Sequence, residues 1–311
     1  MTGYHIYYQT SEDGEYEQIN YLVQLASILN WKKNYGPIKL YCNQRFLESI
    51  SKYGIDKEYD FIDTEYLESV PYKDSMSTFW SFCKIYVAKK IVETESEFCI
   101  LDTDLWIQAP DLLSQEHDLV LHHAEAYDLN YDRNPYPEPR NWLIESEIEE
   151  YDWNTSPANC AILYFKNKSK ELIDAWYEFA IKIVERHKDN NTEQNLRCGT
   201  IFIEQRLLPT IAKKMGISMT VVSPCTYLTW IPASLADGRE WRPALDYSER
   251  SLYICSNIKH VWGAKKFYSE NWIRELIIDN AMIGINLVQN QERKYFKLYS
   301  DVREVHPKKY I

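Results

Sequence analysis

A short apolar run leads directly into two carboxylates in Phe98-Cys99-Ile100-Leu101-Asp102-Thr103-Asp104-Leu105-Trp106. The first four residues predict a short buried strand. In α/β sheets, ligands bind at the carboxyl ends of the strands, so we expect both carboxylates at the ligand-binding edge. Two anions at this spacing repel each other unless a cation offsets them, and Mg²⁺ or Mn²⁺ suits such oxygen ligands. Two solvated turn residues are the alternative interpretation of an isolated Asp-x-Asp.

Segments of strand-like and helix-like character alternate in the first hundred residues. The predicted strands are 4–9, 38–42, 59–62 and 98–101, and the predicted helices are 17–31, 44–52 and 78–93. Strands that alternate with helices indicate parallel strands joined by helical crossovers. We therefore expect an α/β fold with a mixed, mainly parallel sheet and helices on both of its faces.

The second half of the chain is less regular. Further strands are predicted at 118–123, 158–165 and 220–222, and further helices at 170–186, 200–215 and 271–283. Residues 127–153 are aromatic and lack periodicity, which favours an ordered lid. Because no repeat or linker divides the chain, residues 1–285 are expected to form a single domain, followed by a charged, aromatic tail at 286–311.

The composition is that of an acidic globular protein of 311 residues, with 35 Lys and Arg against 46 Asp and Glu and a net charge of −11. This charge excludes non-specific nucleic-acid binding as the main function. The nine glycines lie too far apart for GxGxxG or a P-loop, and GxSxG is absent. The seven cysteines include no CxxC pair, and no apolar stretch has the length of a membrane span, so we expect a reducing, cytoplasmic location.

Five segments, in order, resemble motifs of nucleotide-sugar-dependent glycosyltransferases with the Rossmann-related GT-A fold, and of glycosyltransferase family 8 in particular. They are Ser81-Phe82-Cys83-Lys84, Asp102-Thr103-Asp104, Asn159-Cys160-Ala161-Ile162-Leu163-Tyr164-Phe165, Glu204-Gln205-x-x-Leu208 and His260-Val261-Trp262-Gly263-Ala264-Lys265-Lys266. The resemblance spans roughly Tyr4 to Lys266. Lys84 stands where Arg is more usual, Glu204 stands where Asp is commoner, and the family's Pro-Trp after Lys266 is missing, which indicates a divergent relative.

This resemblance implies a metal-dependent hexosyltransferase-like enzyme that uses a nucleoside diphosphate sugar, with a UDP-sugar as the expected donor. It implies that Asp102, Asp104 and His260 hold Mn²⁺ or Mg²⁺, and that Asn159, Glu204 and Gln205 lie beside the transferred sugar. The residues assigned to the donor nucleotide are Tyr8, Thr10, Lys84, Asp102, Thr103, Asp104, Gly263, Lys265 and Lys266. The local cations would neutralise the charge that gathers on the diphosphate leaving group. The acceptor is a glycan, a lipid-linked sugar or another molecule.

Several alternatives stay open on the residues alone. An inverting reaction needs a carboxylate base, for which Asp152, Asp237 and Glu204 are candidates. A carbohydrate- or nucleotide-binding protein that keeps the fold without turnover is the alternative to an enzyme. The basic, aromatic tail suits a weak peripheral contact with an anionic membrane face, a solvated tail or an oligomer contact. The aromatic residues Trp153, Trp230 and Trp241 suit either sugar stacking or packing.

Overall fold

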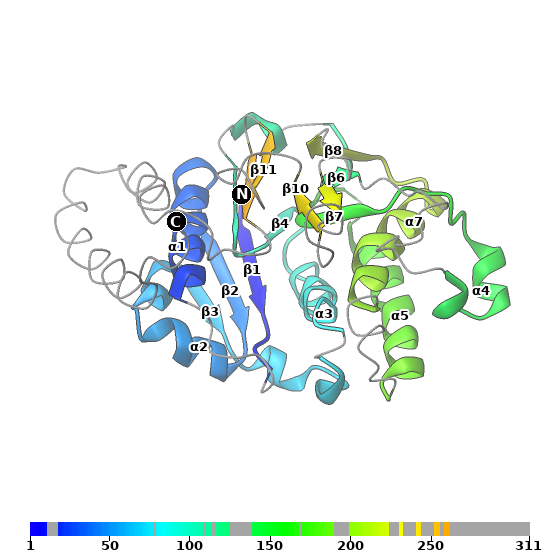
Figure 1. Ribbon diagram of the computed structural model, residues 1–311, viewed down its shortest axis with the longest axis horizontal. Helices are drawn as coiled ribbons and strands as arrows, with labels where there is room; N and C mark the ends of the chain where they lie inside the picture. Colours follow the sequence, from blue (N-terminus) through cyan, green and yellow to red (C-terminus); the bar gives the residue numbers. More distant parts are fainter. Residues whose placement is uncertain are drawn as a thin grey trace.

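The computed structural model describes residues 1–10, 18–76, 79–107, 110–113, 116–124, 139–167, 169–189, 199–223, 230–232, 241–243, 252–255 and 258–261. Its centre is a seven-stranded sheet with the order β3-β2-β1-β4-β7-β6-β8 (Figure 1). The strands are β1 (Gly3–Tyr7), β2 (Ile38–Cys42), β3 (Phe61–Asp63), β4 (Phe98–Leu101), β6 (Leu119–Ala124), β7 (Ala158–Phe165) and β8 (Met219–Ser223). Within this sheet β7 alone runs against the other strands.

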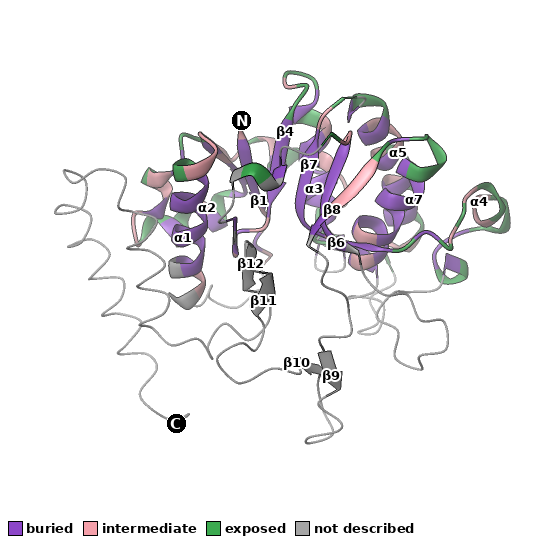
Figure 2. Cartoon of the chain, turned by 90° about the horizontal axis from the view of Figure 1, so that it is seen from above, coloured by how far each residue is buried: buried purple, intermediate pink, exposed green. Residues whose placement is uncertain are grey.

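Helices cover both faces of the sheet, as Figures 1 and 2 show. Helices α1 (Gln18–Asn34) and α2 (Gln44–Ser51) pack on one face, and α3 (Phe82–Ile91), α5 (Ser169–His187) and α7 (Leu207–Lys214) pack on the other. Side chains of a strand alternate between the faces, so Phe98 and Ile100 join the core under α3 and α5, whereas Cys99 and Leu101 join the core under α1. The predicted mixed, mainly parallel α/β fold is therefore confirmed.

A second, three-stranded sheet adjoins the first. It has the order β11-β12-β5 and comprises β5 (Leu105–Ile107), β11 (Leu252–Cys255) and β12 (Ile258–Val261). A separate hairpin pairs β9 (Trp230–Pro232) with β10 (Trp241–Pro243). Because only three residues separate the end of β4 from the start of β5, Asp102-Thr103-Asp104 is the link between the two sheets.

The remaining helical segments are short. They are the 3₁₀ turns η1 (Ile55–Glu58), η2 (Tyr66–Ser69), η3 (Lys73–Ser75), η4 (Pro110–Leu113) and η5 (Pro139–Asn141), the π-helical turn η6 (Phe202–Arg206) and the helix α4 (Glu145–Glu150).

Three predictions differ from the structure or lie beyond it. The loop expected at 127–153 contains η5 and α4, because the Glu147 carboxylate accepts a hydrogen bond from the Ile144 N–H and pairs with Arg186, contacts that periodicity does not reveal. The helix expected at 200–215 is interrupted by η6. The helix expected at 271–283 and the tail at 286–311 lie outside the described residues.

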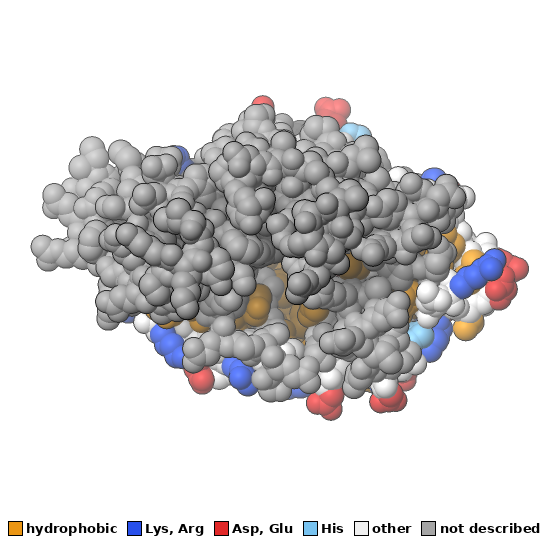
Figure 3. Space-filling view, viewed as in Figure 1, with side chains coloured by type: hydrophobic (Ala, Val, Ile, Leu, Met, Phe, Trp, Pro, Cys, Tyr) orange, Lys and Arg blue, Asp and Glu red, His pale blue; other side chains and the backbone are white. Residues whose placement is uncertain are grey.

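Charged side chains of both signs are interspersed along the rim of the face seen in Figure 3. Several exposed lysines pair with nearby carboxylates, as Lys73 does with Glu68 at 2.8 Å and Lys170 with Glu93 at 3.0 Å. Exposed pairs of this kind contribute about 0–1 kcal/mol to stability. Among the helices that the structure describes, none is both long enough and apolar enough to cross a lipid bilayer.

Candidate active site

Polar side chains gather at the edge of the main sheet where the parallel strands end. Asp102 follows β4, Tyr8 follows β1, and His123 lies near the end of β6. Because β7 runs the opposite way, its first residues reach the same edge, and Asn159 pairs with His123 in the register of the two strands. The reversal of one strand thus adds a residue to the edge at which α/β sheets bind ligands.

The centre of this edge is a buried ion cluster formed by Lys84, Asp102 and Glu204. The Lys84 Nζ lies 2.5 Å from Asp102 Oδ1 and 2.6 Å from Glu204 Oε1, and it also approaches the Cys160 carbonyl oxygen at 3.5 Å. Lys84 and Glu204 are buried, whereas the Asp102 side chain is 30% exposed. An unpaired buried charge is very costly, so these groups stabilise one another and keep a fixed arrangement.

The electrostatics of the cluster favour the charged ammonium. Burial by itself lowers the pKa of Lys84, but the adjacent carboxylates of Asp102 and Glu204 outweigh it and raise the pKa above its usual value. Lys84 is therefore a permanent cation at neutral pH. With Asp104 two residues from Asp102, the site carries more carboxylates than cations among its described side chains, and a divalent ion would offset this excess.

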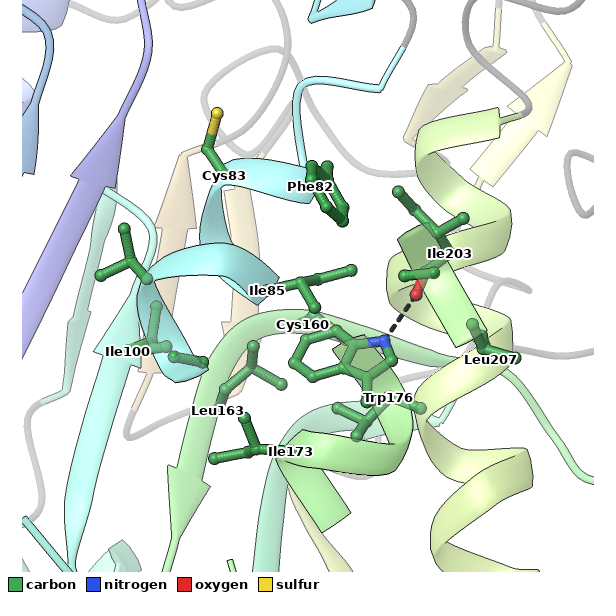
Figure 4. Close-up of a cluster of buried hydrophobic side chains, with 14 of the residues drawn as sticks. Phe82, Cys83, Ile85, Ile100, Cys160, Leu163, Ile173, Trp176, Ile203 and Leu207 are labelled. Atoms are coloured by element: carbon green, nitrogen blue, oxygen red, sulfur yellow. Dashed lines mark hydrogen bonds between the residues drawn. The ribbon is translucent and has the colours of Figure 1, made fainter. Parts of the chain in front are cut away.

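Glu204 reaches the cluster because it lies on the π-helical turn η6 (Phe202–Arg206). Such turns are uncommon and frequently occur at functional sites, since the wider turn changes which side chains face inward. Side chains from other elements contact its carbonyl groups: Trp176 Nε1 donates to the Ile203 oxygen at 2.7 Å (Figure 4), and Cys160 Sγ donates to the Glu204 oxygen at 3.6 Å. These contacts hold the turn against α5 and β7.

A second set of contacts fixes the start of this helical segment to the start of α3. Ser81 Oγ donates to the Thr200 carbonyl oxygen at 3.0 Å, and Thr200 Oγ1 accepts from the Ser81 N–H at 2.9 Å. Lys84 begins the next turn after Ser81, and Glu204 lies one turn after Thr200. The two buried hydroxyl residues thereby set the distance between the helices that carry the ion pair.

An irregularity in β7 lies directly beside the cluster. Leu121 pairs with Leu163 and His123 with Asn159, so β7 has additional residues opposite His122. The Asn159 Oδ1 accepts from the Ala161 N–H at 3.0 Å, which holds this irregularity in place. Bulges of this kind re-aim groups next to active sites, and here the Cys160 carbonyl oxygen faces Lys84.

Two buried histidines next to Asn159 were not assigned to the site from the sequence. His122 Nδ1 lies 3.1 Å from Asn159 Oδ1 and 3.2 Å from His123 Nδ1. An amide oxygen only accepts, so His122 Nδ1 carries a hydrogen and donates it. The only signal in the sequence is their place at the end of a predicted strand, and that signal does not separate them from ordinary core histidines.

The proposed metal ligands are only partly described by the structure. Asp104 directly precedes β5, and β12 pairs with β5 so that His260 lies opposite Leu105. The backbone of His260 is therefore beside the Asp102–Asp104 link, as a shared site requires. The described side chains contain no group of three or more His, Cys, Asp or Glu that could hold a metal ion, and the His260 side chain is outside them.

Some of the other predicted site residues are described by the structure, and some lie outside the described side chains. Tyr8 and Thr10 are half-buried after β1, Thr103 is buried within the link, and Gln205 is half-buried on η6 beside Glu204. Asp152 pairs with Lys213 at 2.7 Å on an exposed surface, which does not suit a base at this edge. Trp153 packs on Phe202, with 5.7 Å between ring centroids. Outside the described side chains are Gly263, Lys265, Lys266, Asp237, Trp230 and Trp241.

No protein-family model matches the chain, and no curated protein sequence matches it. The similar solved structures include the galactosyltransferase LgtC in complex with donor and acceptor sugar analogs, at 9% identity over 92% of this chain and 98% of that chain, with a TM-score of 0.41. They also include mouse xyloside xylosyltransferase 1 in its apo form, at 8% identity over 71% and 84% of the chains, with a TM-score of 0.40, and the PaToxG glycosyltransferase, at 10% identity over 69% of each chain, with a TM-score of 0.37. Likenesses this remote establish neither a family nor an activity for this chain.

Proposed function

We propose that this protein is a glycosyltransferase with a GT-A-like fold that moves a sugar from a nucleoside diphosphate sugar, with a divalent metal at Asp102 and Asp104. The observation that carries the proposal is the buried Lys84–Asp102–Glu204 cluster at the carboxyl end of β4. It joins residues from three of the five segments that resemble glycosyltransferase motifs. A cation and carboxylates at this edge suit an anionic diphosphate ligand that brings its own metal ion.

The donor diphosphate would bind at the Asp102–Asp104 link. Asp102, Asp104 and His260 would hold Mn²⁺ or Mg²⁺, which would neutralise charge on the departing diphosphate. Lys84 is a fixed cation at the same edge, so it stabilises developing negative charge without reorganisation during the reaction. Gly263, Lys265 and Lys266 would complete the diphosphate site after β12, and Tyr8, Thr10 and Thr103 would contact the nucleoside, for which uridine is expected.

The sugar would lie toward Asn159, Glu204 and Gln205. Glu204 is 1% exposed and its Oε1 is bound by Lys84. This arrangement suits a group that orients Lys84 and the donor sugar better than one that takes a proton from an acceptor. The half-buried Gln205 follows on the same turn and is the better candidate for direct contact with the sugar.

Calorimetric titration tests the donor assignment directly. UDP and a panel of UDP-sugars are titrated into the protein with and without Mn²⁺, and we expect tight binding only with the metal. Asp104→Ala is expected to abolish this metal-dependent binding. The matched control is Asp174→Asn, because Asp174 lies on α5 and pairs with Lys89 at 3.2 Å and Lys170 at 3.0 Å on the surface.

Two outcomes would lead to other conclusions. Binding that does not depend on metal, or no binding of any nucleoside diphosphate, would contradict the proposed site. Binding of a sugar or nucleotide without release of nucleoside diphosphate, in the presence of a broad acceptor panel, would favour the non-catalytic binding protein instead.

A further inference from the structure

A chain of buried polar side chains runs beneath the Asp102–Asp104 link, on the face of the sheet opposite Lys84. Gln24 Nε2 lies 2.7 Å from the Tyr59 hydroxyl, which lies 2.8 Å from His5 Nδ1. His5 Nε2 lies 3.2 Å from Ser27 Oγ, and Ser27 Oγ lies 2.5 Å from the Leu105 carbonyl oxygen. Gln24, Ser27 and His5 are at most 1% exposed. These hydrogen-bonded side chains connect β1 and α1 to the first residue of β5.

The directions of the hydrogen bonds in this chain follow from its last member and from the neutral state of His5. The Leu105 carbonyl only accepts, so Ser27 donates to it and must accept from His5 Nε2. Burial lowers the pKa of His5 to about 3 against a smaller opposing effect of Asp104, so at neutral pH the ring carries its single hydrogen on Nε2. Because burial keeps His5 neutral, its Nδ1 carries no hydrogen and accepts from the Tyr59 hydroxyl, whose oxygen accepts from Gln24.

Helix α1, which carries Gln24 and Ser27, also contacts Ile107 at the end of β5. Asn30 Oδ1 accepts from the Ile107 N–H at 2.7 Å, and Asn34 Nδ2 donates to the Ile107 carbonyl oxygen at 3.1 Å. Ser27, Asn30 and Asn34 are three and four residues apart, so they form one stripe along α1. Backbone groups of Leu105 and Ile107 point to the same side of β5, because alternate residues of a strand share a direction. The α1 stripe thus replaces a neighbouring strand on this side, while β12 pairs on the other.

We propose that His5 is a positioning residue for the proposed metal site: through Ser27 it fixes the Leu105 carbonyl, and with it Asp104 on one side and the paired His260 strand on the other. The inference rests on the proposed function, since it concerns the same metal. This positioning role explains why a neutral histidine and the polar groups of Gln24, Ser27 and Tyr59 are buried where apolar side chains would pack as well. Partners behind metal ligands commonly change metal affinity by about 10- to 100-fold when they are removed.

Two substitutions at His5 separate positioning from simple packing. His5→Met fills the space but removes both ring nitrogens, whereas His5→Gln places an amide N–H near the position of Nε2 and keeps the donor to Ser27. Ile28→Val is the matched control, because Ile28 is fully buried on the same helix and makes no contribution to the polar stripe. Thermal unfolding of each variant shows how much stability is lost.

The readout is the affinity for Mn²⁺ in the presence of UDP, followed by the electron paramagnetic resonance signal of the free ion. We expect His5→Met to weaken Mn²⁺ binding by about 10-fold or more, His5→Gln to restore most of it, and Ile28→Val to leave it unchanged. Unchanged Mn²⁺ affinity in His5→Met, or an equal loss of affinity in Ile28→Val, would overturn the role of His5 but leave the proposed metal site in place. A wild-type protein that binds no Mn²⁺ would overturn the metal site itself, and the role of His5 with it.

Discussion

Lys84 on α3 and Glu204 on the π-helical turn η6 are 120 residues apart in the sequence, and their side chains meet at 2.6 Å in the protein interior. Asp102 joins the same ammonium group at 2.5 Å from the end of β4. The contact therefore ties together the central strand and two helical segments of the same sheet face. It also places a fixed positive charge at the edge where the ligand is expected.

The buried pair predicts a large and specific stability effect. Lys84→Met leaves the buried Glu204 carboxylate without its cation, and breaking such a pair costs about 3–5 kcal/mol. The double variant Lys84→Met/Glu204→Gln removes the uncompensated charge, so it is expected to recover much of this stability while remaining inactive. Urea denaturation measures the free energy of unfolding of both variants.

The control for this prediction is an exposed lysine. Lys73→Met removes a surface pair with Glu68 and is expected to cost less than about 1 kcal/mol. A double variant no more stable than Lys84→Met would mean that the lost stability does not come from the unpaired carboxylate.

The support of the π-helical turn predicts a difference between two buried tryptophans. Trp176→Phe removes the N–H donor to the Ile203 carbonyl and should cost about 1–3 kcal/mol, because that oxygen loses a buried partner. It should also lower turnover, since Glu204 is the next residue on the turn. Trp31→Phe is the control, because Trp31 lies on α1, on the other face of the sheet, and donates to the Pro37 carbonyl at 3.1 Å.

Donor hydrolysis and urea denaturation of both tryptophan variants check this expectation. Trp31→Phe should lose stability and keep its turnover. If both variants lose turnover in proportion to stability, the turn has no particular role in the site.

The buried histidine predicts an acid-sensitive stability. The pKa of His5 is lowered to about 3 by burial, against about 6.5 in the unfolded chain. Between these values the unfolded state binds a proton that the folded state does not, so the contribution of His5 is complete above pH 6.5 and is lost as the pH falls. The loss is at most about 1.4 kcal/mol per pH unit.

Urea denaturation at pH 7, 6 and 5 measures this slope. His5→Gln lacks the titrating group, so its stability should fall less steeply with acidification than that of the wild type. Equal slopes in the two proteins would show that His5 is not held neutral by the fold.

The sequence predicted the sheet well because the signals for it are local. Phe98 to Leu101 form a compact apolar run, and the alternation of strands and helices before it leaves few topologies other than parallel crossovers. The structure confirms this fold, and it also places Lys84, Asp102 and Glu204 in one cluster. The roles given to Asn159, Gln205, His260 and the lysines after it remain predictions, as do the single domain, the tail's membrane contact and the cytoplasmic location.

What the sequence did not reveal depends on contacts between distant segments. Strands β5 and β12 have three and four residues, too few for a periodic pattern, and they exist because they pair with each other. The π turn at Glu204 has the same apolar spacing as an α-helix over this length. His5 looks like any residue of an aromatic strand, and only its contacts with Tyr59 and Ser27 distinguish it.

The most direct test of the proposed glycosyltransferase is hydrolysis of nucleoside diphosphate sugars, measured as released nucleoside diphosphate across a donor panel with and without Mn²⁺. We expect slow hydrolysis of one or a few donors that requires the metal, is lost in Asp104→Ala and persists in Asp174→Asn. Release of nucleoside diphosphate that is unchanged in Asp104→Ala, or the absence of release from every donor, would contradict the account.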